Sequence, residues 1–321
     1  MSHANVAAVI LAAGKSTRMR TELCKVLHPI CGRPMLAYVI DACRRAGVQR
    51  YFVIVGYGKD QVISAFSGDA QVGFVEQREQ RGTGHAVLCA REQVADKFDH
   101  VVVLCGDAPL IRAETITQLV ERHLTDGAAA TLATAVLPDP TGYGRILRDS
   151  EGRLRGIVEQ NDCTPEQRQI REINPSYYCF NTRDLFGALE NITPNNAKNE
   201  YYLTDALAIL INAGKRAAAI TAVPPEDVFG INSRAELAMV NRVMRDRINA
   251  AVMDMGVTIV DPQSTWIDAR ATIGQDTVIH PFSHIGPAAI GRNCVIGPFA
   301  RLSGGAVADG AVLGPAWEAA R

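Results

Sequence analysis

A six-residue period of aliphatic side chains near the end of the chain constrains its fold more than any other feature. Isoleucine or leucine recurs with one shift of phase at Ile267, Ile273, Ile279, Ile285, Ile290, Ile296 and Leu302. Glycine directly follows four of these seven residues. A hexapeptide period with a small residue after the aliphatic one is typical of a parallel β-helix, in which each aliphatic points inward. The pattern predicts a short β-helix over residues 257–321, whose period decays after Gly304.

The first two-thirds of the chain has a different pattern, in which apolar strand signals alternate with helix signals. The predicted strands cover residues 6–13, 51–55, 101–105, 129–136 and 217–223, and the predicted helices cover residues 34–46, 85–94, 113–124 and 203–213. The run from Val6 to Ala13 is continuously apolar, as expected of a strand buried on both faces. The alternation predicts an α/β domain with a doubly wound, mostly parallel sheet over residues 1–232.

A long amphipathic helix is predicted between these two regions, over residues 233–256. Ser233 and Glu236 have the spacing of a capping box, and Gly256 ends the apolar periodicity. We expect this helix to link the two domains.

Composition excludes several classes of protein. The 321 residues include 33 basic and 34 acidic side chains, so no overall charge attracts nucleic acid or an anionic membrane. No apolar run reaches the length of a membrane span, and no signal peptide is recognisable. The eight cysteines lack the spacing of a zinc site. We expect a cytoplasmic protein with reduced thiols and no nucleic-acid or membrane partner.

The segment after the first predicted strand is a candidate phosphate-binding loop. It carries Gly14, Lys15 and Arg18, with Lys25 further on. It is not a P-loop, because Val9 stands where that motif needs glycine, and it lacks the three glycines of a dinucleotide fingerprint. A glycine turn at the carboxyl end of a strand, with three cations, suits a polyphosphate. A solvated basic turn is an equally good interpretation of the loop alone.

Several motifs in one order resemble the nucleotide-sugar pyrophosphorylases. They lie at residues 11–28, 77–86, 105–110, 139–146, 156–159, 172–174, 199–202 and 230–232. Taken together they are most similar to the bacterial bifunctional enzymes with N-acetylglucosamine-1-phosphate uridylyltransferase and glucosamine-1-phosphate acetyltransferase activities. The resemblance covers nearly the whole chain. It implies a Rossmann-like nucleotidyltransferase domain, a linker helix and a left-handed β-helix.

The resemblance also implies a reaction. UTP and N-acetylglucosamine 1-phosphate would give UDP-N-acetylglucosamine, a precursor of peptidoglycan and lipopolysaccharide, and pyrophosphate. The sugar phosphate is already an anion, so it needs no general base to attack the α-phosphate of UTP. By the resemblance, Arg18, Lys25 and Asp107 are the catalytic residues. The implied nucleotide-binding residues are Leu11, Ala12, Ala13, Gly14, Lys25, Gln77, Gly82, Thr83, Gly106 and Asp107.

The same resemblance implies that Asp107 and Asn232 hold Mg²⁺, and that Gly144, Glu159, Asn174 and Asn232 bind the sugar. Mg²⁺ suits one carboxylate and one amide, because it keeps waters and takes substrate phosphates as its other ligands. Structural roles are also open at this stage. Thr83 and Asn232 each stand where a helix N-cap is expected.

The chain departs from the family pattern in three places. Ser16 replaces a frequent glycine, and Cys24 replaces a proline, which is expected to loosen the turn before Lys25. Ser303 replaces an arginine in the repeats, and related β-helices continue through further coils that carry the acetyltransferase site. We therefore expect no acetyltransferase activity, while the coils that are present are expected to support a homotrimer.

Three other interpretations remain open from the sequence. The chain could be a pyrophosphorylase for another pair, such as dTTP and glucose 1-phosphate, because pocket shape decides specificity. It could be a nucleotide-sensing scaffold without catalysis. It could also be a β-helix scaffold with a vestigial front domain. The presence of Arg18, Lys25, Asp107 and Asn232 together favours the enzyme.

Overall fold

The computed structural model describes residues 5–15, 17–194 and 199–315. Contacts divide the chain into two units, each described here by itself. The first unit comprises residues 1–27 and 35–232, and the second comprises residues 28–34 and 233–321. Ser16, one of the departures noted above, lies outside the described residues.

A mostly parallel sheet forms the centre of the first unit, in the order β11-β7-β10-β6-β1-β4-β5. Its strands are β1 (Val6–Leu11), β4 (Arg50–Val55), β5 (Val72–Glu76), β6 (His100–Cys105), β7 (Ala130–Val136), β10 (Glu172–Asn181) and β11 (Ala217–Thr221). The pairs β1–β4, β1–β6, β4–β5 and β7–β11 are parallel, whereas β10 runs antiparallel to β6 and β7. A hairpin of β8 (Gly144–Arg148) and β9 (Leu154–Val158) joins the sheet through β10. The predicted parallel α/β fold is confirmed.

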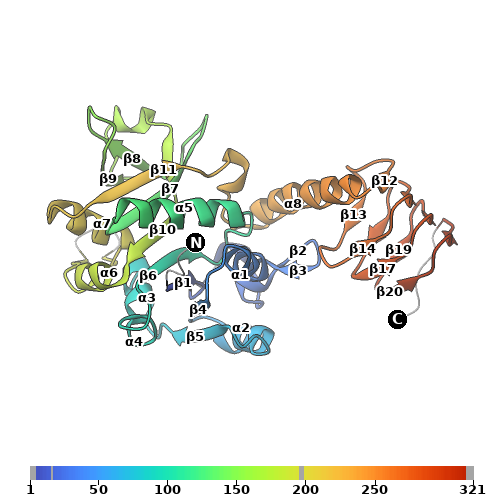
Figure 1. The fold of residues 1–321 in the computed structure, drawn as a ribbon, viewed down its shortest axis with the longest axis horizontal. Helices are drawn as coiled ribbons and strands as arrows, with labels where there is room; N and C mark the ends of the chain where they lie inside the picture. Colours follow the sequence, from blue (N-terminus) through green and yellow to red (C-terminus); the bar gives the residue numbers. More distant parts are fainter. Residues whose placement is uncertain (1–4, 16, 195–198, 316–321) are drawn as a thin grey trace. The chain divides into compact units, whose positions relative to one another are not determined.

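Helices cover both faces of this sheet (Figure 1). They are α1 (Met35–Arg45), α2 (Lys59–Phe66), α3 (Thr83–Leu88), α4 (Arg91–Val94), α5 (Ala113–Asp126), α6 (Thr182–Leu189) and α7 (Leu203–Asn212). Short 3₁₀ turns are η1 (Thr17–Met19), η2 (Lys25–Leu27), η3 (Gln167–Gln169) and η4 (Pro225–Asp227). The apolar core on one face combines β1 residues such as Val9 with side chains of α3, α6 and α7, while α1 and α5 pack against each other.

One predicted helix is wrong. The sequence favoured a single helix over residues 85–94, but the structure has α3 and α4 with a break between them. At the break, the N–H of Ala90 donates to Val87 O, three residues back, and the N–H of Gln93 donates to Ala90 O. These tighter turns redirect the chain, which a periodicity argument does not detect.

The second unit is a helix followed by a parallel β-helix. Its helix α8 (Arg234–Asp254) begins at Ser233, whose Oγ accepts from the N–H of Glu236 at 3.3 Å and donates to Glu236 Oε2 at 3.0 Å. This confirms the predicted capping box. Asn232, the other candidate, is not the N-cap.

Three narrow parallel sheets form the β-helix, in the orders β12-β15-β18-β21, β13-β16-β19 and β14-β17-β20. Their strands are β12 (Thr258–Ile259), β13 (Trp266–Ile267), β14 (Thr272–Ile273), β15 (Val278–Ile279), β16 (His284–Ile285), β17 (Ala288–Ile290), β18 (Val295–Ile296), β19 (Arg301–Leu302), β20 (Gly305–Val307) and β21 (Val312–Leu313). All seven aliphatics of the hexapeptide period are buried, so this prediction is confirmed. The coils continue to β21, beyond the point where the period decays in the sequence.

The sequence did not indicate that residues 28–34 belong to the second unit. They form a two-stranded hairpin of β2 (Pro29–Ile30) and β3 (Arg33–Pro34). The N–H of Cys31 donates to Asn241 Oδ1 at 3.0 Å, and the N–H of Ala269 donates to Cys31 O at 3.1 Å. Within the described ranges, no helix has both the length and the apolar character needed to cross a bilayer.

Candidate functional site

The turn after β1 forms one wall of a cavity of about 270 Å³ at the carboxyl end of the sheet. Backbone hydrogen bonds hold the turn, because the N–H of Ala12 donates to Ile54 O at 2.9 Å and the N–H of Gly106 donates to Leu11 O at 2.9 Å. The expected nucleotide-binding residues that line this cavity are Leu11, Ala12, Ala13, Gly14, Lys25, Gln77, Gly82, Thr83 and Asp107. The structure therefore brings together residues from three separate motifs, at residues 11–28, 77–86 and 105–110.

Two of the expected residues do not line this cavity. Gly106 is buried beneath the turn, where its N–H bonds to Leu11. Arg18 lies exposed on η1 and lines neither this cavity nor the larger one beside it.

Lys25 joins the two expected metal ligands. Its Nζ donates to Asp107 Oδ2 at 2.5 Å and to Asn232 Oδ1 at 3.0 Å. The side chains of Lys25 and Asp107 are 12% and 21% exposed, so the ion pair is largely shielded from water. The segment carrying Asn232 is held there because the N–H of Ile231 donates to Asp107 O at 3.0 Å. An ammonium thus lies where the carboxylate and the amide oxygen converge.

This donor set fits a hard divalent cation. Asp107 and Asn232 supply oxygens within hydrogen-bond distance of one nitrogen, so both can approach one positive centre. Two protein oxygens leave room for the waters and phosphate oxygens that Mg²⁺ usually keeps. No group of three or more His, Cys, Asp or Glu side chains arranged to hold a metal occurs in the described part of the chain. Any metal here would depend on the substrate for further ligands.

The turn before Lys25 is held in place. Cys24 is buried, and its N–H donates to Gln61 Oε1 at 2.9 Å. A proline could not form this bond because it lacks the N–H. Cys24 therefore has a backbone hydrogen bond that a proline at the same position would lack.

Gln77 is buried at the side of the smaller cavity, and its amide orientation is fixed. Its Nε2 donates to Gly82 O at 3.1 Å and approaches His85 Nδ1 at 3.1 Å. Burial, with a smaller contribution from Arg81, lowers the pKa of His85, so its ring is neutral and Nδ1 can accept. The Oε1 atom is the end of the Gln77 amide that remains available as an acceptor.

Gly82 and Thr83 enter α3 through a close backbone approach. Gly82 has φ +110°, and a Cβ placed there would lie 2.5 Å from Tyr201 O. Only glycine avoids both the strained dihedral and the collision. Thr83 is not the N-cap that the sequence suggested, because Gly82 occupies that position. Thr83 Oγ1 instead accepts from the N–H of Leu203 at 3.0 Å.

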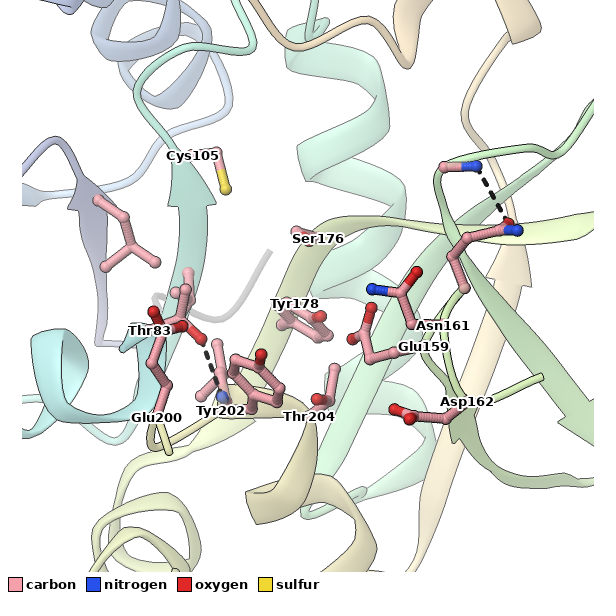
Figure 2. Close-up of a pocket in the computed structure, with 15 residues that line it drawn as sticks. Thr83, Cys105, Glu159, Asn161, Asp162, Ser176, Tyr178, Glu200, Tyr202 and Thr204 are labelled. Atoms are coloured by element: carbon pink, nitrogen blue, oxygen red, sulfur yellow. Dashed lines mark hydrogen bonds between the residues drawn. The ribbon is translucent and has the colours of Figure 1, made fainter. Parts of the chain in front are cut away.

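A second cavity of about 470 Å³ adjoins the first and shares Leu11, Thr83, Cys105 and Glu200 with it. Figure 2 shows carboxylates and hydroxyls gathered around it. Its polar side chains are those of Thr83, Glu159, Gln160, Asn161, Asp162, Ser176, Tyr178, Glu200, Tyr202 and Thr204. The described lining contains no Lys, Arg or His. Such a surface suits a neutral polyol, whose hydroxyls can donate to carboxylates.

The expected sugar-binding residues are placed differently from one another. Glu159 lines the larger cavity. Gly144 lies behind it, where a Cβ would meet Ile157 Cγ2 at 2.9 Å. Asn174 is buried and does not line the cavity, because its Oδ1 accepts from the N–H of Ser176 at 3.0 Å and its Nδ2 donates to the Tyr178 hydroxyl at 2.7 Å. Asn232 lies with Lys25 instead.

Several residues of the larger cavity were missed from the sequence. Ser176, Tyr178, Tyr202 and Thr204 all line it. Each lies within or a few residues after a recognised motif, at residues 172–174 or 199–202, so motif proximity was the available signal. Cys105, one of the eight thiols, lines both cavities.

The thiol and phenol groups of the larger cavity are neutral at physiological pH. Burial raises the pKa of the Cys105 thiol to about 12, and burial also raises the pKa of the Tyr178 hydroxyl. The pKa of Tyr202 is raised by burial and, to a lesser extent, by Glu200 and Glu159. The cavity therefore offers neutral hydroxyls and no thiolate nucleophile.

Comparison with known proteins gives two family matches. The family described as MobA-like NTP transferase domain matches residues 8–197. The family described as bacterial transferase hexapeptide (six repeats) matches residues 270–304. The matches fall on the sheet and on the β-helix, respectively.

Curated relatives and a solved structure are also similar. The protein called Bifunctional protein GlmU from Pelotomaculum thermopropionicum is 48% identical over 87% of this chain and 61% of its own length. The protein of the same name from Geobacillus thermodenitrificans is 48% identical over 85% and 59%. The chain thus spans about three-fifths of these relatives. The crystal structure of UDP-glucose pyrophosphorylase complexed with UDP-glucose shares the fold, with a TM-score of 0.62 and 16% identity over 75% of this chain and 98% of that one.

Proposed function

The chain belongs to the family of MobA-like NTP transferase domains, and we propose that it transfers a uridylyl group from UTP to N-acetylglucosamine 1-phosphate. The products are UDP-N-acetylglucosamine and pyrophosphate. The observation that carries this proposal is the pair of adjoining cavities at the carboxyl end of the sheet. The smaller cavity contains Lys25, whose ammonium can bind phosphate, and Asp107, whose carboxylate can bind a divalent cation. The larger cavity offers carboxylates that accept hydrogen bonds from sugar hydroxyls.

The smaller cavity supports uracil as the base. Gln77 Nε2 is committed to Gly82 O and His85, which leaves Oε1 as an acceptor. Uracil presents an N3–H donor, whereas cytosine presents an acceptor at the same position, so Gln77 favours uracil. Thymine has the same N3–H, and Gln77 alone does not distinguish the two bases.

Bond formation needs positioning and charge stabilisation more than acid–base chemistry. An oxygen of the sugar phosphate attacks the α-phosphorus of UTP, the bond from that phosphorus to the β-phosphate oxygen breaks, and pyrophosphate leaves in line. Lys25 donates to the reacting phosphates, where negative charge builds up in the transition state. Arg18 approaches the triphosphate from the exposed turn η1. The resemblance and the cation chemistry support both assignments.

Asp107 and Asn232 would hold the divalent cation that related nucleotidyltransferases use, and we propose Mg²⁺. When bound, the ion neutralises phosphate charge. Because the Lys25 ammonium contacts the same two oxygens, it has to release at least one of them to the cation. Asp107→Ala should abolish metal-dependent turnover, and retained activity would move the metal site elsewhere.

The assignment of functions to the domains is also a proposal. Residues 1–27 and 35–232 would form the nucleotidyltransferase domain, residues 233–256 the linker helix and residues 257–321 the β-helix that supports a homotrimer. The expected lack of acetyltransferase activity stays a prediction. Acetyl-CoA-dependent acetylation of glucosamine 1-phosphate by this chain would contradict it.

Pyrophosphate release tests the proposed reaction. The protein is incubated with Mg²⁺, one nucleoside triphosphate and one sugar 1-phosphate, with N-acetylglucosamine, glucosamine and glucose 1-phosphates compared. Fast release only with UTP and the N-acetylated sugar supports the proposal. Release with another pair would keep the mechanism and replace the substrate, whereas UTP binding without release from any pair would indicate a nucleotide sensor.

A further inference from the structure

Gln160 lines the larger cavity with an amide whose orientation two donors determine. Its Oε1 accepts from Arg145 Nη2 at 2.8 Å and from the N–H of Gly142 at 3.1 Å. A guanidinium and a backbone N–H can only donate, so the oxygen end of the amide must face them. The Nε2 end, with two N–H donors, is therefore directed away from Arg145.

Arg145 is an unusual residue for this position. It is 1% exposed and is the largest fully buried side chain in the described part of the chain. Its Nη1 donates to Tyr143 O, its Nε has no partner, and it forms no ion pair with any described residue. Removing an arginine charge from water costs several kcal/mol, about the penalty of one buried ion. Asp139, whose pKa is lowered mainly by hydrogen bonding and in small part by Arg145, forms no salt bridge with it. Burial of Arg145 therefore lowers the stability of the fold, so stability does not explain why an arginine occupies this position.

Strand pairing fixes Arg145 behind the cavity wall. In β8, Arg145 pairs with Val158 of β9 and with Ile173 of β10. Gln160 follows β9 by two residues. The guanidinium therefore engages Gln160 through Oε1, and Nε2 is the end of the amide that Arg145 does not hold.

The Nε2 donors of Gln160 have no partner among the described residues, although the side chain is half-buried. The charged groups around the same cavity are the carboxylates of Glu159, Asp162 and Glu200, which only accept hydrogen bonds. Sugar hydroxyls can donate to these carboxylates. An acyl carbonyl cannot donate, so it needs a committed donor such as the Gln160 amide.

We propose that Gln160 recognises the acyl carbonyl oxygen of the N-acylated sugar through Nε2, with Arg145 as the positioning residue that fixes its amide. This assignment rests on the proposed function, because it names how the same cavity selects its sugar. The donor would make N-acetylglucosamine 1-phosphate a better substrate than glucose 1-phosphate, whose C2 hydroxyl is shorter and can use the carboxylates instead.

The selectivity ratio measures this contact. It is the kcat/KM for N-acetylglucosamine 1-phosphate divided by that for glucose 1-phosphate, both with UTP. Gln160→Met removes the donor at nearly constant volume, and we expect the ratio to fall about tenfold. Gln160→Glu keeps an oxygen for Arg145 and forms an ion pair with it, so this variant should fold well. Its second oxygen would repel the carbonyl, and the ratio should fall further.

Gln169→Glu is the matched control for charge. It adds the same negative charge at an exposed glutamine that lines neither cavity, so the ratio should stay unchanged. An equal fall of the ratio in Gln169→Glu and Gln160→Glu would overturn the assignment. Thermal melts of all variants show whether the fold is retained.

Arg145 is tested by a double-mutant cycle. Arg145→Lys keeps a positive charge but loses the planar fork, so Gln160 can rotate and the ratio should fall. In the Gln160→Met background, Arg145→Lys should leave the ratio unchanged, because there is no amide left to position. A fall of similar size in both backgrounds would mean a general structural effect and would overturn the positioning role.

Product binding gives a readout independent of turnover. Calorimetry with UDP-N-acetylglucosamine and UDP-glucose should show the preference for the acetylated product shrinking in Gln160→Met. If wild type uses N-acetylglucosamine 1-phosphate and the Gln160 variants retain its full preference, the inference fails while the proposed function stands. If wild type shows no preference for the acetylated sugar, the proposed function fails and this inference fails with it.

Discussion

Replacing Lys25 by methionine should change metal binding and catalysis in opposite directions. Methionine keeps an apolar stem of similar length but removes the ammonium that contacts Asp107 and Asn232. In the protein without substrate, this ammonium competes with a divalent cation for the same two oxygens. The variant should therefore bind the cation more tightly in the absence of substrate, yet turn over more slowly.

The magnitude follows from the two hydrogen bonds. A hydrogen bond to a charged group contributes about 1.5–3 kcal/mol, so releasing Asp107 from Lys25 costs the incoming cation about that much. Removing the competitor should tighten cation binding about 10- to 150-fold. For turnover, losing one donor at developing negative charge typically lowers kcat about 10²- to 10³-fold. KM for UTP should rise less than kcat falls, since the charge develops in the transition state.

Two assays separate these effects. Titration of the substrate-free protein with Mn²⁺, followed by electron paramagnetic resonance, gives cation affinity, and pyrophosphate release gives kcat and KM. Lys59→Met is the matched control, because it breaks an exposed ion pair with Glu76 (2.8 Å) outside both cavities. A variant with normal kcat and only weaker UTP binding would refute the assignment of Lys25. Unchanged cation affinity would refute the competition.

Three further predictions concern the base, the pH and the backbone. Gln77→Leu removes the acceptor for uracil N3–H and should raise KM for UTP about tenfold in steady-state assays; an unchanged KM would place the base elsewhere. Burial and His100 lower the pKa of His123 to about 4, so the folded state binds fewer protons than the unfolded state below pH 6.5. The contribution of His123 to stability is full above pH 6.5 and falls with decreasing pH, by about 2 kcal/mol at pH 5. The pKa values of His28, His85 and His100 are also lowered, so denaturant titrations should show the pH slope reduced, not abolished, in His123→Gln. Gly82→Ala should lower the free energy of unfolding by about 3 kcal/mol. Gly127→Ala should lower it by only about 1 kcal/mol, because φ is also positive there but no atom lies close to the added Cβ. Equal losses in chemical denaturation would contradict the collision of the Gly82 Cβ with the backbone.

Much of the fold could be predicted from the sequence because the relevant signals are local. The hexapeptide period predicted the β-helix core, since each coil repeats one environment, and Ile279, Ile285 and Ile296 are all fully buried. The apolar run of β1 predicted a strand covered on both faces, and the capping box at Ser233 predicted the start of α8. Each of these signals depends on residues within a few positions of one another.

The site was only partly predictable, since its contacts join distant segments. The motifs pointed to Lys25, Asp107 and Asn232, but nothing local shows that one ammonium contacts both oxygens across 82 and 207 residues of sequence. Asn174 matched the sugar motif, yet it supports Ser176 and Tyr178 from behind the cavity.

The sequence by itself determined the periodicities, the motif order and hence the two kinds of architecture in this chain. Only the tertiary structure decided which polar atoms face a cavity and which are used internally. For Gln160, a buried guanidinium decides that the amide oxygen is used internally, so that Nε2 is the end that Arg145 does not hold. The physical reason is that hydrogen-bond donors and acceptors are assigned by geometry in space, and strand pairing brings together side chains that are far apart along the chain.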